Sequence, residues 1–251
     1  MITTELLQSS REGRLLRLIL NRPEKRNALN AALCRDLNSA LAEAQNDPEV
    51  GTILLTSNGK SFSAGMDLNE SLAAEAAALA DLHDRLFTAF VWLDKPLIAA
   101  VQGAALAGGT GLVANAHIAI SADDATFGLT EIHIGLWPFL VFRAAVAAMG
   151  ERRTMELSLS GRIFGAAEAQ SYGLVHHVVP AAELESRALE IARAVAESSP
   201  MAIASGLAFV EETRGLGLEE AGRIARNFRQ QIFEGDDFQE RVRRFRARKK
   251  P

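Results

Sequence analysis

The chain is poor in several features that mark particular classes of protein. Its 251 residues include a single cysteine, Cys34, so no disulfide can form within the chain, which fits a reducing compartment. Seven prolines and 19 glycines are too few for a fibrous or disordered chain. No stretch approaches the roughly 20 apolar residues that span a bilayer, and residues 1–5 lack the pattern of a signal peptide. We therefore expect a cytoplasmic protein with no membrane partner.

A strong charge of one sign is also missing. The formal net charge is −4, from 27 basic and 31 acidic residues, which does not favour binding to polyanions. The five histidines lack ligand spacing with carboxylates or thiols, so no metal is expected. Residues 241–250 are basic but interrupted by apolar side chains. This pattern is typical of a helix with one buried stripe, with RNA binding as the alternative, so no nucleic-acid partner is expected.

The sequence does contain a regular alternation of apolar segments. In its first part, strands are predicted at 5–8, 15–21, 52–57, 97–101, 117–121 and 125–127, and helices at 30–46 and 71–92, with a glycine-rich turn into a short helix at 103–111. From Pro138 on, helices are predicted at 139–149, 152–160, 166–172, 181–198, 200–214, 218–233 and 236–248, with one strand at 174–179. This predicts an α/β core over residues 1–195 and a helical region over residues 196–251.

Three segments carry candidate chemistry. Residues 61–68 follow a strand and a turn, and their small side chains allow the backbone to approach a ligand. Residues 95–111 predict a strand, a tight loop and a helix start, whose unpaired N–H groups favour a developing negative oxygen. Residues 125–136 hold a lone carboxylate, Glu131, in an apolar stretch. Taken alone, each also has a plainer interpretation: an ordinary glycine turn, or an acid at a helix N-terminus.

Together and in this order, the three segments resemble those of the crotonase family, the enoyl-CoA hydratases and isomerases. The resemblance covers nearly the whole chain and includes residues 21–29 and 160–175. It implies a spiral of ββα units followed by a helical region that assembles a homotrimer or a dimer of trimers. It also implies an acyl-CoA thioester as substrate, with no permanently bound cofactor.

The resemblance also implies roles for individual residues. The backbone N–H groups of Met66 and Gly108 are expected to form an oxyanion hole, and Glu131 to be the catalytic residue. Such an N–H donor is worth about 3–4 kcal/mol to an enolate oxygen, and an apolar pocket raises the pKa of a carboxylate toward neutrality. The other expected contacts with substrate or CoA are Arg26, Ala28, Ala64, Gly65, Asp67, Leu68, Gly109, Gly111, His133, Trp137, Phe245 and Lys249. The candidates for the acyl end are Leu72, Leu82, Leu86, Trp137 and Phe139.

One position departs from the family pattern and bears on the reaction. Hydratases of the family hold a water with two glutamates, and the first of them falls at Gly111, which cannot do acid–base work. A single carboxylate suffices to move a proton between carbons, so we expect an isomerase that converts 3-enoyl-CoA to 2-enoyl-CoA. The alternatives are a CoA-binding subunit with little catalysis, and a hydratase whose second group is His133, Asp67, Glu70 or Asp81. The remaining histidines, His83, His117, His176 and His177, give no active-site signal.

Overall fold

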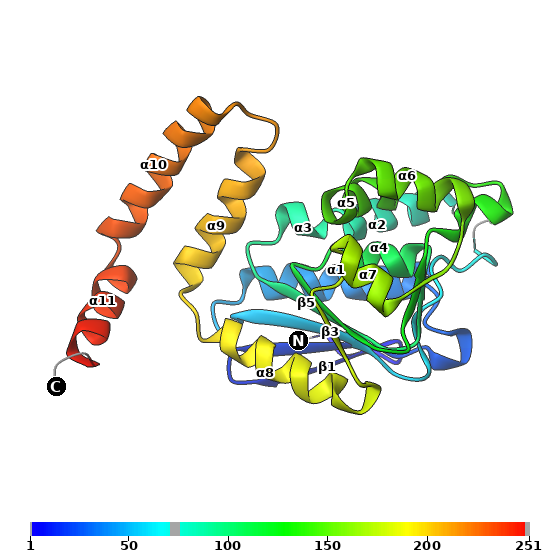
Figure 1. The fold of residues 1–251 in the computed structure, drawn as a ribbon. Helices are drawn as coiled ribbons and strands as arrows, with labels where there is room; N and C mark the ends of the chain where they lie inside the picture. Colours follow the sequence, from blue (N-terminus) through cyan, green and yellow to red (C-terminus); the bar gives the residue numbers. More distant parts are fainter. Residues whose placement is uncertain (1, 71–75, 249–251) are drawn as a thin grey trace. The chain divides into compact units, whose positions relative to one another are not determined.

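The computed structural model describes residues 2–70 and 76–248, and the chain divides into two compact units, Met1–Ala196 and Glu197–Pro251 (Figure 1). Within those described ranges, none of the helices has the combined length and hydropathy of a segment that crosses a bilayer.

The first unit is built on two sheets. The larger has the strand order β1-β2-β3-β5-β7-β10, and all its pairs are parallel except β1 with β2. The smaller has the order β4-β6-β8-β9. The strands of the larger sheet are β1 (Leu7–Glu12), β2 (Leu15–Leu20), β3 (Thr52–Ser57), β5 (Leu97–Val101), β7 (Ile118–Ala122) and β10 (His177–Val179). Those of the smaller are β4 (Ser61–Ser63), β6 (Ala104–Leu106), β8 (Thr126–Gly128) and β9 (Phe164–Gly165).

The connectivity shows the expected ββα repeat. Three times, a strand of the larger sheet is followed by a short strand of the smaller sheet and then by a helical segment. These repeats are β3, β4 and α2 (Ala76–Phe87); β5, β6 and α4 (Gly108–Ala114); and β7, β8 and the 3-10 helix η2 (Thr130–Ile134). Each of the three segments that were predicted to carry chemistry therefore includes a strand of the smaller sheet.

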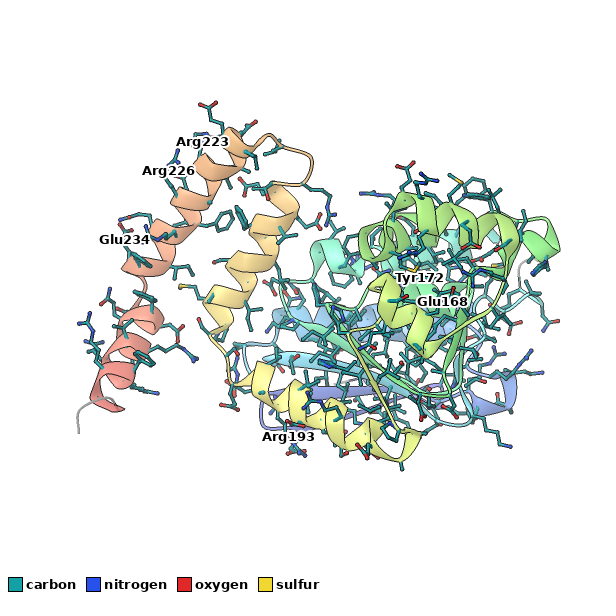
Figure 2. All side chains as sticks on the ribbon, viewed as in Figure 1. Glu168, Tyr172, Arg193, Arg223, Arg226 and Glu234 are labelled. Atoms are coloured by element: carbon teal, nitrogen blue, oxygen red, sulfur yellow. The ribbon has the colours of Figure 1, made fainter. Side chains whose placement is uncertain are left out.

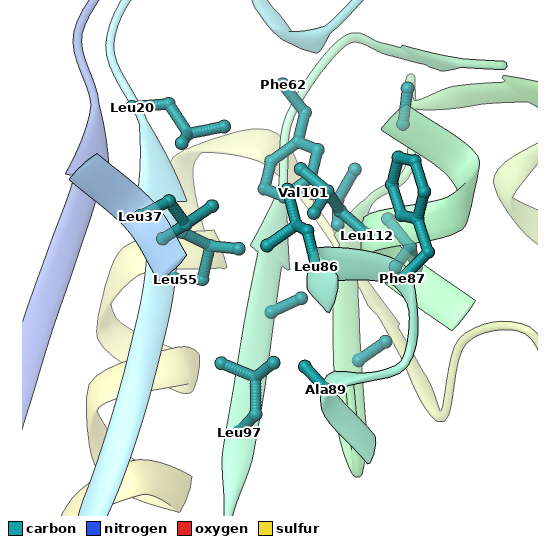
Figure 3. Close-up of a cluster of buried hydrophobic side chains, with 14 of the residues drawn as sticks. Leu20, Leu37, Leu55, Phe62, Leu86, Phe87, Ala89, Leu97, Val101 and Leu112 are labelled. Carbon is teal, nitrogen blue, oxygen red and sulfur yellow. The ribbon is translucent and has the colours of Figure 1, made fainter. Parts of the chain in front are cut away.

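Both faces of the larger sheet are covered, which explains why β3 and β5 are entirely buried. On one face, Leu55, Leu97 and Val101 pack with Leu37 of α1 (Ala31–Asn46) and with side chains of α2 (Figure 3). On the other face, Leu54 belongs to a second cluster that includes buried residues of α8 (Leu184–Ala196). The larger sheet is therefore the buried scaffold of the first unit, while the segments of the site follow strands of the smaller sheet.

Local signals explain most of the helix bounds. Asn30 caps α1, because its Oδ1 accepts a hydrogen bond from the Leu33 N–H at 3.0 Å. The prediction of one continuous helix over residues 71–92 was wrong, because Thr88 separates α2 from α3 (Ala89–Trp92). Residues 71–75 lie outside the described part of the chain. The other helices of the first unit are α5 (Phe139–Met149), α6 (Glu151–Ser160) and α7 (Ala166–Tyr172), with the short 3-10 helices η1 (Pro23–Lys25) and η3 (Ala181–Glu183).

The second unit consists of α9 (Pro200–Glu212), α10 (Leu218–Glu234) and α11 (Asp236–Arg248). Among its described residues, Ile224 is the one that is buried. Apolar side chains such as Met201, Val210 and Phe245 are exposed, and Figure 2 shows how side chains such as Arg223, Arg226 and Glu234 project along α10. The predicted assembly of this region into a trimer stays a prediction.

Candidate active site

A cavity of about 670 Å³ lies in the first unit. Four segments line it: the loop after β4, one face of α2, the start of α4, and the stretch that runs from η2 to the start of α5. Most lining side chains are apolar, and among the described lining residues Glu131 is the one carboxylate and His83 the one histidine. An apolar cavity with a few convergent polar groups is the usual form of a small-molecule site.

Backbone hydrogen bonds hold the loop around Met66. The N–H of Leu29 donates to the Gly65 carbonyl at 2.7 Å, and the N–H of Asp67 donates to the Leu29 carbonyl at 3.2 Å. These bonds use the groups on either side of the Met66 N–H, which itself donates to no described residue. Met66 lines the cavity, so its N–H is held in place without a partner.

The start of α4 meets this loop. A Cβ atom built on Gly65 would lie 2.9 Å from the Gly108 nitrogen, which shows how closely the two loops pack. Gly108 is the first residue of α4, where an N–H has no partner within the helix. It also lines the cavity, and its N–H donates to no described residue. Two unpaired amides therefore come from adjoining loops to one cavity, as an oxyanion hole requires.

The turn into α4 is strained and braced. Ala107 has φ 50° and ψ −119°, a region that costs a residue with a Cβ about 1–3 kcal/mol. Its N–H donates to the Gly128 carbonyl at 2.7 Å. The Thr110 hydroxyl lies 2.7 Å from the Ala105 carbonyl and 3.0 Å from the Gly128 carbonyl, and accepts from the Gly128 N–H at 3.1 Å. These bonds tie the first turn of α4 to β8 and fix the direction of the Gly108 N–H.

Glu131 projects from η2 into the cavity and is only 9% exposed. Burial raises the pKa of its carboxyl group to about 7, against a small opposing effect of a hydrogen bond from its own backbone N–H. Among the described residues, its Oε2 has no hydrogen-bond partner. A carboxyl group with this pKa is populated in both protonation states near neutral pH, which suits a proton shuttle.

His83 was given no role from the sequence, yet it lines the same cavity. It is 4% exposed, its ring donates a hydrogen bond to the Leu29 carbonyl, and its Nε2 has no partner in the described part of the chain. Leu79, His83 and Phe87 all line the cavity at intervals of four residues along α2. This spacing places them on one helix face. The sequence could therefore have indicated that His83 shares a face with Leu79 and Phe87, but other leucines in the same helix made this face hard to recognise.

The glycines other than Gly108 that were predicted to contact substrate do not line the cavity, and their contact with substrate stays a prediction. A Cβ on Gly111 would lie 2.3 Å from Val141 Cγ1 and 3.2 Å from Phe87 Cδ1. A Cβ on Gly109 would lie 2.3 Å from the Ser63 carbonyl oxygen. Gly65 combines φ +86° with a position 2.7 Å from the Leu106 carbonyl oxygen. These glycines permit close packing of the loops instead.

Three other candidates are engaged in the fold. Asp67 pairs with Arg22 at 2.6 Å. Burial alone raises the pKa of Asp67, but hydrogen bonds from Arg22 and Asn69 bring that pKa below its usual value. Glu70 accepts from the Ala31 N–H at 2.7 Å. His133 is exposed and lies outside the cavity, because its Nε2 is 3.0 Å from the Gly161 carbonyl oxygen. None of the three lines the cavity.

Several other predicted contacts can be placed. Ala64, Leu68, Trp137 and Phe139 line the cavity, whereas Arg26, Ala28, Asp81, Leu82 and Leu86 do not. The Arg26 carbonyl accepts from the Ala64 N–H at 2.9 Å, so the exposed Arg26 lies next to the cavity loop. Phe245 belongs to α11 in the second unit. Leu72 and Lys249 lie outside the described residues.

The described ranges hold no cluster of three or more His, Cys, Asp or Glu side chains arranged to bind a metal ion.

Known proteins are similar to this chain over nearly its whole length. The family model described as enoyl-CoA hydratase/isomerase matches residues 10–251. A putative enoyl-CoA hydratase of Thermus thermophilus is 33% identical over 250 residues, covering 96% of this chain and 97% of that protein. The 2,3-dehydroadipyl-CoA hydratase of Escherichia coli is 35% identical over 212 residues, covering 84% of this chain and 83% of that protein.

Solved structures show the same fold. The crystal structure of an enoyl-CoA hydratase from Mycobacterium smegmatis superposes with a TM-score of 0.92 at 28% identity, covering 98% of each chain. The fold is thus that of the crotonase superfamily, as the resemblance implied. The chain belongs to the enoyl-CoA hydratase/isomerase family of enzymes.

Proposed function

We propose that the chain isomerises 3-enoyl-CoA to 2-enoyl-CoA with Glu131 as a single proton shuttle. The observation that carries this proposal is the state of Glu131: a buried carboxyl group whose Oε2 is unpartnered and whose pKa is about 7. Among the described residues it is the one carboxylate that lines the cavity. The position of a second glutamate, Gly111, is closed by Val141.

The proposed reaction uses the two unpaired amides and the carboxylate in turn. The thioester oxygen accepts hydrogen bonds from the Met66 and Gly108 N–H groups. Ionised Glu131 removes a proton from C2, and the resulting negative charge spreads from the thioester oxygen over the conjugated carbons. The protonated Glu131 then returns the proton to C4, which leaves the double bond between C2 and C3. No water enters the reaction, and the enzyme ends in its starting charge state.

Once the thioester oxygen is placed at the two amides, positions for CoA and for the acyl chain can be assigned. The exposed side chain of Arg26 and the backbone near Ala28 adjoin the loop of Ala64, and we assign this side to CoA. The acyl chain would extend toward Trp137 and Phe139, which line the cavity. A trimeric assembly would follow from the exposed apolar side chains of the second unit.

Hydration of 2-enoyl-CoA is the second candidate, since both relatives named above are called hydratases. The test is to assay the purified protein with 3-enoyl-CoA and, separately, with 2-enoyl-CoA, following the absorbance of the conjugated thioester. We expect it to rise with the first substrate. Fast hydration with no isomerisation would refute the proposed double-bond shift, and no turnover of either substrate would favour a CoA-binding subunit.

A further inference from the structure

Two residues that line the cavity each carry a buried polar atom with no partner among the described residues. These atoms are His83 Nε2, from α2, and Glu131 Oε2, from η2. Both side chains are more than nine-tenths buried. A buried polar atom left unpaired costs about 1–3 kcal/mol, so such atoms in a native cavity point to a ligand that pairs with them. An isomerase needs only one of the two, and His83 is therefore unexplained by the double-bond shift.

The hydrogen bonds of His83 define what its Nε2 offers. Since the ring donates to the Leu29 carbonyl and Nε2 has no partner, the donor is the Nδ1–H group. Burial lowers the pKa of His83 and outweighs the raising effects of that hydrogen bond and of the nearby Glu70 charge. The ring is thus neutral, and its Nε2 carries a lone pair that has no partner among the described residues.

The same backbone unit positions His83 and the oxyanion loop. The Leu29 carbonyl accepts both from the His83 ring and from the Asp67 N–H, next to Met66. One helical turn further along α2, Phe87 lies against His83 with ring centroids 5.6 Å apart. Phe87 also crowds the position of a side chain at Gly111. Helix α2 therefore contributes two side chains here. The Phe87 ring helps to block a side chain at Gly111 of α4, and the His83 ring supplies a basic nitrogen.

We propose that His83 is a second catalytic residue and that the cavity also hydrates 2-enoyl-CoA. This inference rests on the same enolate site as the proposed isomerisation. Nε2 takes a proton from a water molecule while the water oxygen bonds to C3. The electron pair of the double bond moves toward the thioester, whose oxygen is held by the Met66 and Gly108 N–H groups.

Glu131, in its protonated form, then gives its proton to C2. The product is a 3-hydroxyacyl-CoA that contains both hydrogens and the oxygen of the water. His83 is left protonated and Glu131 ionised, and exchange with solvent restores both. In this scheme the two groups do the work of the two glutamates in hydratases of the family, with the base moved from α4 to α2.

Two substitutions separate the atoms of the ring. His83→Asn keeps an N–H donor near Nδ1 for Leu29 but removes the Nε2 lone pair. His83→Gln keeps an acceptor near Nε2 that cannot take up a proton. We expect each variant to lose hydration kcat by at least about 100-fold, a larger loss than that of isomerisation kcat. Glu131→Gln is expected to lose both activities.

A matched control is His176→Asn, because the His176 ring accepts from the Ala119 N–H, outside the cavity. We expect it to leave both rates unchanged. Retained isomerisation shows that a His83 variant is folded; if one variant fails to fold, the other decides. The inference is overturned if the native protein does not hydrate 2-enoyl-CoA, if both His83 variants hydrate normally, or if both activities fall together. Hydration that depends on His83 without any isomerisation would reject the isomerase and keep His83.

Discussion

The two sides of the cavity use their polar groups differently. On the α4 side, Gly108 contributes a backbone N–H, and one turn later Gly111 is packed against Val141 and Phe87. On the side of α2 and η2, His83 and Glu131 present side-chain atoms without partners. Backbone amides held by a turn are suited to stabilising charge, whereas titratable side chains are suited to moving protons. In the proposed reactions, the cavity thus stabilises charge on one side and moves protons on the other.

The largest expected effect is the loss of kcat when Glu131, on the side that moves protons, is replaced. Replacing Glu131 by Gln keeps the size of the side chain but removes its ability to exchange a proton. We expect kcat for acyl-CoA turnover to fall between about 100- and 10,000-fold, with little change in KM. Steady-state kinetics on the purified variant measures this. Asp81→Asn is the control, since Asp81 is exposed on the same side but outside the cavity; an unchanged rate in Glu131→Gln would refute the assignment.

The same substitution should also change how the unfolding free energy depends on pH. The folded pKa of Glu131 is about 7, against 4.5 for an ordinary glutamate. As the pH rises from 4.5 to 7, the unfolded chain releases a proton that the folded chain retains, so Glu131 destabilises the fold increasingly. Glu131→Gln should therefore gain about 3 kcal/mol of unfolding free energy over the native protein above pH 7 and about none below pH 4.5. Urea unfolding at several pH values tests this; a pH-independent difference would contradict it.

The next effect concerns the closed α4 side. Alanine is favoured over glycine within a helix by about 1 kcal/mol, so propensity alone predicts that Gly111→Ala stabilises the fold. The structure predicts the reverse, because the added Cβ would lie 2.3 Å from Val141 Cγ1, and overpacking of a core costs about 1–3 kcal/mol. Chemical unfolding of the variant measures the sign.

Two further variants make the test specific. Gly206→Ala in α9 adds a Cβ that meets nothing within 4 Å, so we expect it to be stabilising or neutral. Val141→Ala removes the Cγ1 atom that Gly111→Ala would strike, so the double variant should lose less stability than the two single losses added together. Strict additivity in this cycle would show that Val141 does not close the position.

Much of the scaffold was predictable from local patterns. The apolar run of residues 97–101 gave β5, the run of residues 52–57 with its three central aliphatic residues gave β3, and the side chain of Asn30 marked the start of α1. The smaller sheet was mostly missed, because strands such as β4 and β9 have only three and two residues. Such strands have no measurable periodicity and exist through pairing with segments far along the chain.

Some residues of the site were also predictable from the sequence, whereas others were not. Met66, Gly108 and Glu131 were named from contiguous motifs, and all three line one cavity. His83 was missed because its importance depends on an Nε2 atom that finds no partner, which only the packed structure reveals. The empty position at Gly111 was visible in the sequence, but the residue that fills the space, Val141, lies 30 positions later and on another helix.

The smallest expected effect concerns the turn that aims the Gly108 N–H. Ala107 has φ 50° and ψ −119°, a backbone conformation that glycine adopts without strain and that alanine adopts only with strain. Ala107→Gly should therefore raise the unfolding free energy by about 1 kcal/mol, despite the greater entropy of glycine in the unfolded chain. Ala105→Gly, in the buried strand β6, is the control and should be destabilising. If Ala107→Gly destabilises as much as this control, the turn is not strained, and the direction of the Gly108 N–H must be fixed by Thr110 and Gly128 alone.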